Sequence, residues 1–216
     1  MMKRLIYLLA VILLASGCSS EIAVEDPTPK PGPKLQGTIE MEVPGGGFRQ
    51  TRALTDTDEH RITTVEVLVF KKPNATTPDD NATFAYRATT TLINGSAAVK
   101  SFKAALIPAA SNLQQLVVFA NPGTAVTSAL AGFTPNTTTK GQAMNAIVMN
   151  RTAAWNSTGG SFDPLPMWGE TAFVTITSAS DIPASVSLLR GVARIDVKVA
   201  TTAENDFKLS GVWLYN

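Results

Sequence analysis

The feature of the sequence that most constrains the fold is an alternating stretch at residues 188–199. From Leu189 onward, apolar or small residues occupy every second position, and charged residues occupy most of the positions between them. A period of two with β-branched residues on one face is typical of a half-buried β-strand. Val186 and Leu188 are apolar in the opposite phase, which predicts a bulge or a sharp bend near Leu188. A strand of this length has to pack against other strands, so we expect a β-sandwich.

Turn residues separate several other stretches that also have strand patterns. They lie at residues 35–43, 61–70, 84–91, 97–106, 113–120, 171–177 and 206–215. The pair Asn94-Gly95 is a hairpin turn signal. Residues 116–120 form an unbroken apolar run, which predicts a strand covered on both faces. We therefore expect an all-β fold, a Greek-key-like β-sandwich of about seven strands.

A helical pattern interrupts the strands at residues 138–150. Apolar residues there recur at spacings of three and four, as on one face of an α-helix: Ala143, Met144, Ile147 and Val148. We expect one or two short helices of this kind in the loops of the sandwich.

The N-terminus has the order of regions found in an export signal. Two basic residues precede an apolar run at residues 5–14, and the small residues 15–17 lead to Cys18. The run is too short to span a bilayer, so we interpret residues 1–17 as a signal peptide. Leu-Ala-Ser-Gly-Cys resembles a bacterial lipobox, in which Cys18 is acylated, for example with palmitate. The alternative is a plain signal peptide with an incidental cysteine. Several acyl chains, at about 0.8 kcal/mol per buried methylene, would hold the protein on a membrane.

A proline-rich segment separates the cysteine from the first predicted strand. Proline occupies every second position of residues 27–33, which excludes a helix and favours an extended polyproline conformation. At about 3.1 Å per residue, residues 19–36 would reach roughly 50 Å from the membrane. We therefore assign residues 18–34 as a tether and residues 35–216 as an N-terminal β-sandwich domain.

Charge and composition exclude several classes of function. The chain has a net charge of +1 and no basic run, whereas nucleic-acid binding requires clustered Lys and Arg. It contains one Cys and one His, which cannot form an intrachain disulfide or a Cys/His metal site. Hydrophobic residues make up 44% of the sequence and charged residues 16%, so the chain can bury a large core.

No motif in the sequence predicts an enzyme, a cofactor or a metal site. The single histidine, His60, lies in an acidic loop with no nucleophile motif near it, and we interpret it as a solvated loop residue. Gly45-Gly46-Gly47 is not followed by the Lys-Ser/Thr of a phosphate-binding loop. Two clusters of acidic residues lack the spacing of a calcium loop, and we interpret them as solubilising charges. The first is Asp56, Asp58 and Glu59, and the second is Asp79 and Asp80.

The order of the first two predicted strands suggests a mechanism of assembly. A cut after Arg52 would free strand 35–43 from its covalent connection to the domain. Its departure would open a groove that four apolar side chains had filled: Leu35, Ile39, Met41 and Val43. Burying such side chains again stabilises by about 1.5–3 kcal/mol each before ordering costs. An extended segment of another subunit could refill the groove by strand complementation, and such a head-to-tail contact propagates as a filament.

Several segments together resemble the fimbrillins of Bacteroidales, the subunits of type V pili and their anchor relatives. They are the lipobox at Cys18, Thr51-Arg52-Ala53 before strand 61–70, residues 116–122, Pro166-Met167-Trp168-Gly169-Glu170, Val192-Ala193-Arg194-Ile195-Asp196-Val197, and residues 207–216. The two longer motifs are specific in combination, and the resemblance extends over most of the chain beyond the signal peptide.

The resemblance implies a lipoprotein precursor that is exported to the cell outer membrane. There an Arg-specific protease cuts it, and the subunits polymerise by donor-strand exchange into surface fimbriae that serve adhesion. For this sequence, it implies lipidation at Cys18 and cleavage between Arg52 and Ala53, with Arg49 as the second choice. Residues 35–52 would be the removable segment. The partners implied are other fimbrial subunits, the protease and the outer membrane.

The sequence also departs from the fimbrillin pattern. Those subunits usually have two β-sandwich domains and a donor strand at the far C-terminus, whereas this chain reaches Asn216 within or just after a predicted strand. We therefore expect that a C-terminal domain is missing here. Two alternatives stay open: an anchor subunit that keeps its lipid, and a surface lipoprotein that binds glycans through Trp155, Trp168 and Trp213, which are otherwise core aromatics. A secreted hydrolase is a third, weaker alternative.

Overall fold

The computed structural model describes residues 34–43, 60–93, 100–150 and 163–191. All of them belong to the compact unit Gly32–Asn216. The strands are β1 (Leu35–Glu42), β2 (Val65–Lys72), β3 (Thr83–Leu92), β4 (Ser101–Leu106), β5 (Ala109–Ala120), β6 (Met167–Glu170), β7 (Val174–Ile176), β8 (Ser185–Ser187) and β9 (Leu189–Arg190). The helices are α3 (Ala125–Leu130), α4 (Lys140–Ala146) and the short 3-10 helices η1 (Asp79–Asn81) and η2 (Ala179–Asp181). The predicted all-β class is confirmed.

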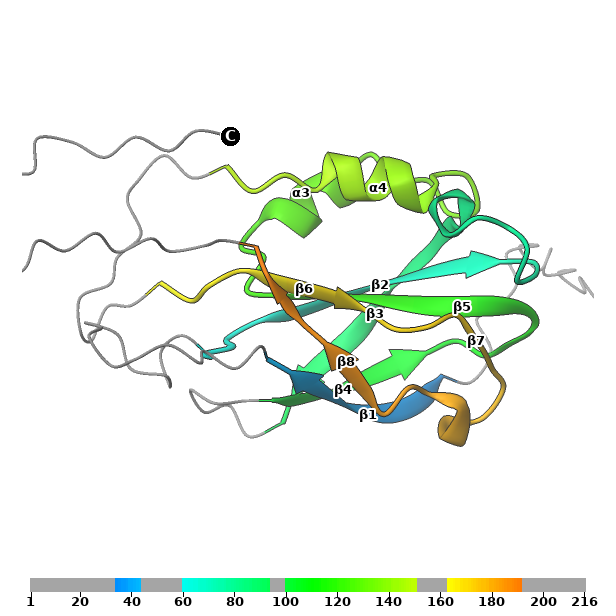
Figure 1. Cartoon of the computed structure of the whole chain (residues 1–216), viewed down its shortest axis with the longest axis horizontal. Helices are drawn as coiled ribbons and strands as arrows, with labels where there is room; N and C mark the ends of the chain where they lie inside the picture. The colour runs from blue at the N-terminus through cyan, green and yellow to red at the C-terminus, as the bar shows by residue number, and fades with distance from the viewer. Residues whose placement is uncertain (1–33, 44–59, 94–99, 151–162, 192–216) are drawn as a thin grey trace, which may run out of the picture. The chain divides into compact units, whose positions relative to one another are not determined.

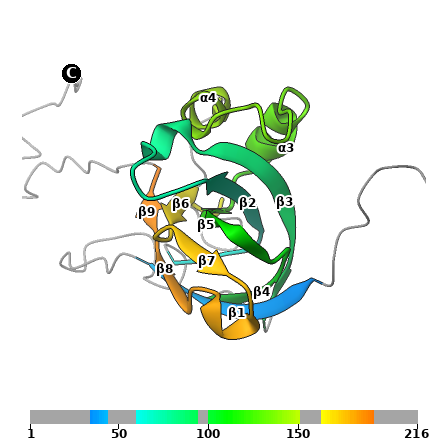
Figure 2. The same cartoon turned by 90° about the vertical axis from the view of Figure 1, so that its right-hand side faces the viewer.

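One continuous path of pairing connects the strands in the order β8-β1-β4-β3-β2-β5-β6-β9, and β7 also pairs with β5. Within it, the order β5-β2-β3-β4 is that of a Greek key. β3 pairs with β2 through its first half and with β4 through its second, so it bends from one layer into the other (Figure 2). β8 and β9 stand at opposite ends of this order, although only Leu188 separates them in the sequence.

The central strands β2 and β5 are covered on both faces, which the unbroken apolar run at residues 116–120 predicts for β5. Their inner side chains, which include Val67 and Val118, belong to the main core that β1 and β4 also line. Their outer side chains, which include Phe70 and Val117, belong to a second cluster with residues of α3 and α4. Both helices lie on this outer side of the sheet (Figure 1).

Several elements differ in extent from the sequence prediction, most clearly a helix and a strand. The helix predicted at residues 138–150 is confirmed but shorter, because it begins at a capping box between Thr139 and Gln142 and ends at Ala146. The strand predicted at residues 171–177 is confirmed but shorter, as β7, and an additional strand, β6, precedes it; both pair with β5. Between them the Thr171 hydroxyl accepts a hydrogen bond from the Leu116 amide at 3.1 Å, so a side chain takes the place of a main-chain partner.

The break predicted near Leu188 is confirmed, and its cause is a change of neighbour. β8 pairs with β1 on one side of Leu188, and β9 pairs with β6 on the other. Leu188 itself is buried in the main core, whereas Leu189 is 59% exposed. The buried apolar face predicted from Leu189 onward therefore does not begin at Leu189. Residues 192–199 lie outside the described ranges.

Candidate functional site

The strand expected to be removable, β1, is an inner strand of the sheet rather than an edge. It pairs antiparallel with β4 over six residue pairs, from Leu35 opposite Leu106 to Glu40 opposite Ser101. It pairs parallel with β8 only over Glu40–Glu42. Hydrogen bonds from the Glu40 amide to the Ala184 carbonyl and from the Leu188 amide to the Glu42 carbonyl, both 2.8 Å, fix this second side. The C-terminal part of β1 is therefore held on both sides.

The apolar face predicted for residues 35–43 points into the main core. Ile39 and Met41 are completely buried, and Leu35 and Val43 are partly buried against the same cluster. Phe102 of β4 lies opposite Ile39, and Val186 of β8 lies beside Met41. The side chains on the other face are exposed: Gln36, Thr38, Glu40 and Glu42. Contacts of β1 with the rest of the domain thus come mostly from one face and from the main chain. On the exposed face, the Glu42 carboxylate accepts a hydrogen bond from the Ser187 hydroxyl at 2.5 Å.

Gly37 shares the inward-facing phase of Leu35 and Ile39, and its role was not predicted from the sequence. A methyl group on Gly37 would lie 2.6 Å from Cγ2 and 2.7 Å from Cδ1 of Ile182. Ile182 is itself buried in the main core, directly after η2. It fills the place on the inner side of β1 that a side chain at position 37 would take. A glycine inside a strand pattern is the signal for such a close approach.

The 3-10 helix η2, which presents Ile182, is capped by Asp181. This carboxylate accepts hydrogen bonds from the backbone amides of Thr177 and Ser178, each at 2.8 Å, and from both hydroxyl groups. Hydrogen bonds from the Thr177 side chain and from the two amides favour the ionised form, so the pKa of Asp181 is lowered from 3.8 to about 2. The cap therefore depends on a charged carboxylate.

We expect the cap of η2 to weaken in acid. Because the folded-state pKa of Asp181 lies below the unfolded value, its contribution to stability is present above about pH 4 and is lost as the pH falls towards 2. The unfolding free energies of the wild type and of Asp181→Ala should accordingly differ at pH 6 and converge near pH 2, as measured by urea denaturation.

Asp181→Asn is the matched control for this titration, because an amide oxygen can accept hydrogen bonds but has no proton to gain. Its difference in stability from Asp181→Ala should not change with pH. A gap between the wild type and Asp181→Ala that stays constant from pH 6 to pH 2 would contradict the assignment.

Asn121 is a second residue whose role was not predicted from the sequence. Its backbone has φ of 54°, and its side chain is buried. The side-chain oxygen accepts from the amide and the hydroxyl of Thr63, at 2.8 and 3.1 Å, and the side-chain nitrogen donates to the carbonyls of Arg61 and Leu165, both at 2.8 Å. Asn121 thereby ties the end of β5 to the segment entering β2 and to the one entering β6.

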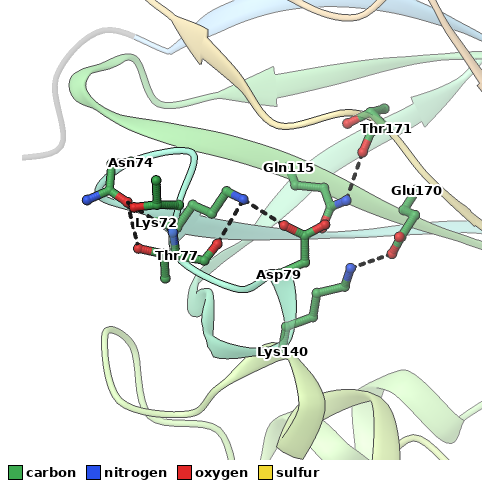
Figure 3. Close-up of polar contacts among 9 residues, drawn as sticks. Lys72, Asn74, Thr77, Asp79, Gln115, Lys140, Glu170 and Thr171 are labelled. Atoms are coloured by element: carbon green, nitrogen blue, oxygen red, sulfur yellow. Dashed lines mark hydrogen bonds and ion pairs between the residues drawn. The ribbon is translucent and has the colours of Figure 1, made fainter.

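The carboxylate Asp79, expected to be a solubilising charge, is instead the partner of a buried lysine (Figure 3). Lys72 Nζ lies 2.6 Å from the Asp79 carboxylate and 3.1 Å from the Thr77 carbonyl. The hydrogen bond from Lys72 keeps the pKa of Asp79 below its usual value. Nearby, Lys140 Nζ lies 2.6 Å from Glu170 and connects α4 to β6. No group of three potential metal ligands occurs among the described residues.

The remaining candidates are placed as follows. His60 is half-buried just before β2, and its Nε2 atom makes no hydrogen bond with the described residues. Trp168 lies on β6, packs against the outer cluster and lines an apolar pocket of about 290 Å³ together with Met144 and Met149. Other residues considered in the sequence analysis, as sites or as rejected candidates, lie outside the described ranges: Cys18, Gly45, Gly46, Gly47, Arg49, Arg52, Ala53, Asp56, Asp58, Glu59, Trp155 and Trp213.

Comparisons with protein-family models, with curated proteins and with solved structures found no match. None of the helices in the described ranges is long and apolar enough to cross a membrane.

Proposed function

We propose that this protein is the lipoprotein precursor of a fimbrial subunit, in which β1 is a removable strand. Cleavage between Arg52 and Ala53 by an Arg-specific protease detaches β1 from the domain. An extended segment of another subunit then takes its place, and repetition of this step builds an adhesive filament from the cell outer membrane.

The position of β1 supports this proposal. A strand that lies between β4 and β8 leaves a slot between two strands when it departs. Loss of an edge strand would only reduce the number of strands in the sheet by one. Two completely buried side chains, Ile39 and Met41, would leave cavities in the core. Refilling these places is worth about 3–6 kcal/mol before ordering costs. The vacated slot would thus favour a new occupant over remaining empty.

The main chain supports the proposal in a second way. Removal of β1 would leave main-chain groups on both sides without their strand partner: the Lys100 carbonyl beside β4, which accepts from the Met41 amide, and the Ala184 carbonyl and Leu188 amide beside β8. Unpaired sheet edges of this kind bind extended peptides through main-chain hydrogen bonds. An incoming segment could therefore gain a ladder on both sides of the slot.

The proposal is tested by replacing Arg52 with alanine in cells that export the protein. We expect the N-terminus at Ala53 to disappear, the processed fraction to fall at least tenfold, and filaments to be lost. Intact-mass and N-terminal analysis of the surface protein measure processing, and electron microscopy measures filaments. Arg49→Ala is the matched control, since it removes an arginine three positions away in the same segment.

The mature N-terminus separates the alternatives. A wild-type protein that starts at acylated Cys18 and forms no filaments would overturn the role as a filament stalk and favour a permanently anchored lipoprotein. If Arg52→Ala is processed normally and Arg49→Ala is not processed, the cleavage site is after Arg49. The proposal that β1 is removable would still hold in that case.

A further inference from the structure

We propose that the slot occupied by β1 accepts only strands with a glycine at one position, the place of Gly37, and that Ile182 imposes this requirement. The partner is an extended segment of another subunit with the spacing Leu-x-Gly-x-aliphatic-x-aliphatic. This inference rests on the proposed removable strand and adds to it a rule for which segments can enter.

The requirement follows from how Ile182 approaches β1. A methyl group at position 37 would meet Cγ2 of Ile182 at 2.6 Å and Cβ at 3.1 Å, in addition to Cδ1 at 2.7 Å. Carbon atoms do not approach this closely without a shift. Cβ and Cγ2 belong to the branched, stiff part of the side chain next to the backbone, so rotation of the far end cannot relieve the conflict.

The backbone that carries Ile182 is also fixed. The Ile182 amide donates to the Ala179 carbonyl, and the preceding residue, Asp181, holds the turn through its four hydrogen bonds. The Ile182 side chain is buried in the same core as Ile39 and Met41. Moving Ile182 aside would therefore disturb a capped turn and a packed core.

The space available for inward-facing side chains thus differs along the slot. Full-size side chains fit at the places of Ile39 and Met41, where β1 inserts buried groups, and none fits at the place between Leu35 and Ile39. The spacing alone does not admit every glycine-containing segment. Residues 209–215 also read Leu-x-Gly-x-apolar-x-apolar, but they would place Trp213 where the completely buried Ile39 lies, and an oversized side chain strains a packed core.

The experiment measures strand exchange in the full-length protein after cleavage at Arg52. Fluorescent peptides with the sequence of residues 35–43 are added, and binding is followed by fluorescence anisotropy. Three peptides are compared: the native sequence, Gly37→Val, and Thr38→Val, which places the same side chain on the exposed face one residue away. The same series is repeated with protein carrying Ile182→Ala, which removes the obstructing atoms beyond Cβ.

We expect the native and Thr38→Val peptides to bind with similar affinity and the Gly37→Val peptide to bind about tenfold or more weakly. In Ile182→Ala protein, the Gly37→Val peptide should recover to within about threefold of the native peptide. Equal binding of the native and Gly37→Val peptides, or no recovery in Ile182→Ala, would overturn the glycine requirement. The proposal that β1 is removable would not be affected by either result. Failure of all three peptides to bind fully cleaved protein would overturn the removable strand itself, and the requirement with it.

Discussion

Replacing Asn121 with alanine is expected to lower the free energy of unfolding by about 3–5 kcal/mol. The substitution removes three part-buried hydrogen bonds, to the carbonyls of Arg61 and Leu165 and from the amide of Thr63, and each contributes about 0.5–1.5 kcal/mol. Alanine also loses about 1 kcal/mol in the left-handed backbone conformation that Asn121 adopts. Urea denaturation followed by circular dichroism measures the difference.

Asn136 provides a matched control within the same fold. It has the same residue type and a similar backbone conformation, with φ of 62°, but its side chain is exposed. Asn136→Ala should therefore cost only the backbone part, about 1 kcal/mol. If the two variants lost equal stability, the hydrogen bonds of the Asn121 side chain would contribute nothing, and its role as a tie between segments would be wrong.

Ile39→Ala is expected to destabilise the uncleaved protein by about 2–5 kcal/mol, the usual cost of truncating a completely buried aliphatic side chain. Its neighbour Thr38 is exposed on the opposite face of β1, so Thr38→Ala should stay within about 0.5 kcal/mol of the wild type. Thermal or urea unfolding of both variants provides the comparison.

The same substitution distinguishes a removable strand from a permanent one. If β1 is discarded during assembly, filaments formed from Ile39→Ala precursors contain no altered residue and should resist denaturation as the wild type does. Filaments that are weakened as much as the precursor would show that β1 stays in the assembled protein, which contradicts the proposed function.

Much of the fold follows from patterns that are local in the sequence. The alternation at residues 35–43 identifies both the strand and its buried face, because a period of two leaves only one face apolar. The run at residues 116–120 has no alternation, so both faces of that strand are apolar, which predicts burial on both. β6 was not predicted, since four residues that include Trp168 and Gly169 carry too little pattern to indicate a strand.

The candidate site was predictable in part. The sequence indicates which side chains of β1 face the core, but not that β1 lies between β4 and β8. That position depends on residues 185–187, which are far away in the sequence and pair with β1 in parallel. The contact between Gly37 and Ile182 joins segments with no local relation, and the hydrogen bonds of the Asn121 side-chain nitrogen likewise span 44 and 60 residues. Periodicity cannot report contacts of this range.

The pairing of β1 on two sides also determines how the domain responds to force. Hydrogen bonds between strands run across the strand axis, so a pull along β1 loads the ladder to β4 and the ladder to β8 at the same moment. An edge strand peeled from its end would instead break its bonds one after another. Any segment that occupies this slot is therefore held most strongly against tension along its own length, as a subunit of the proposed filament would need to be.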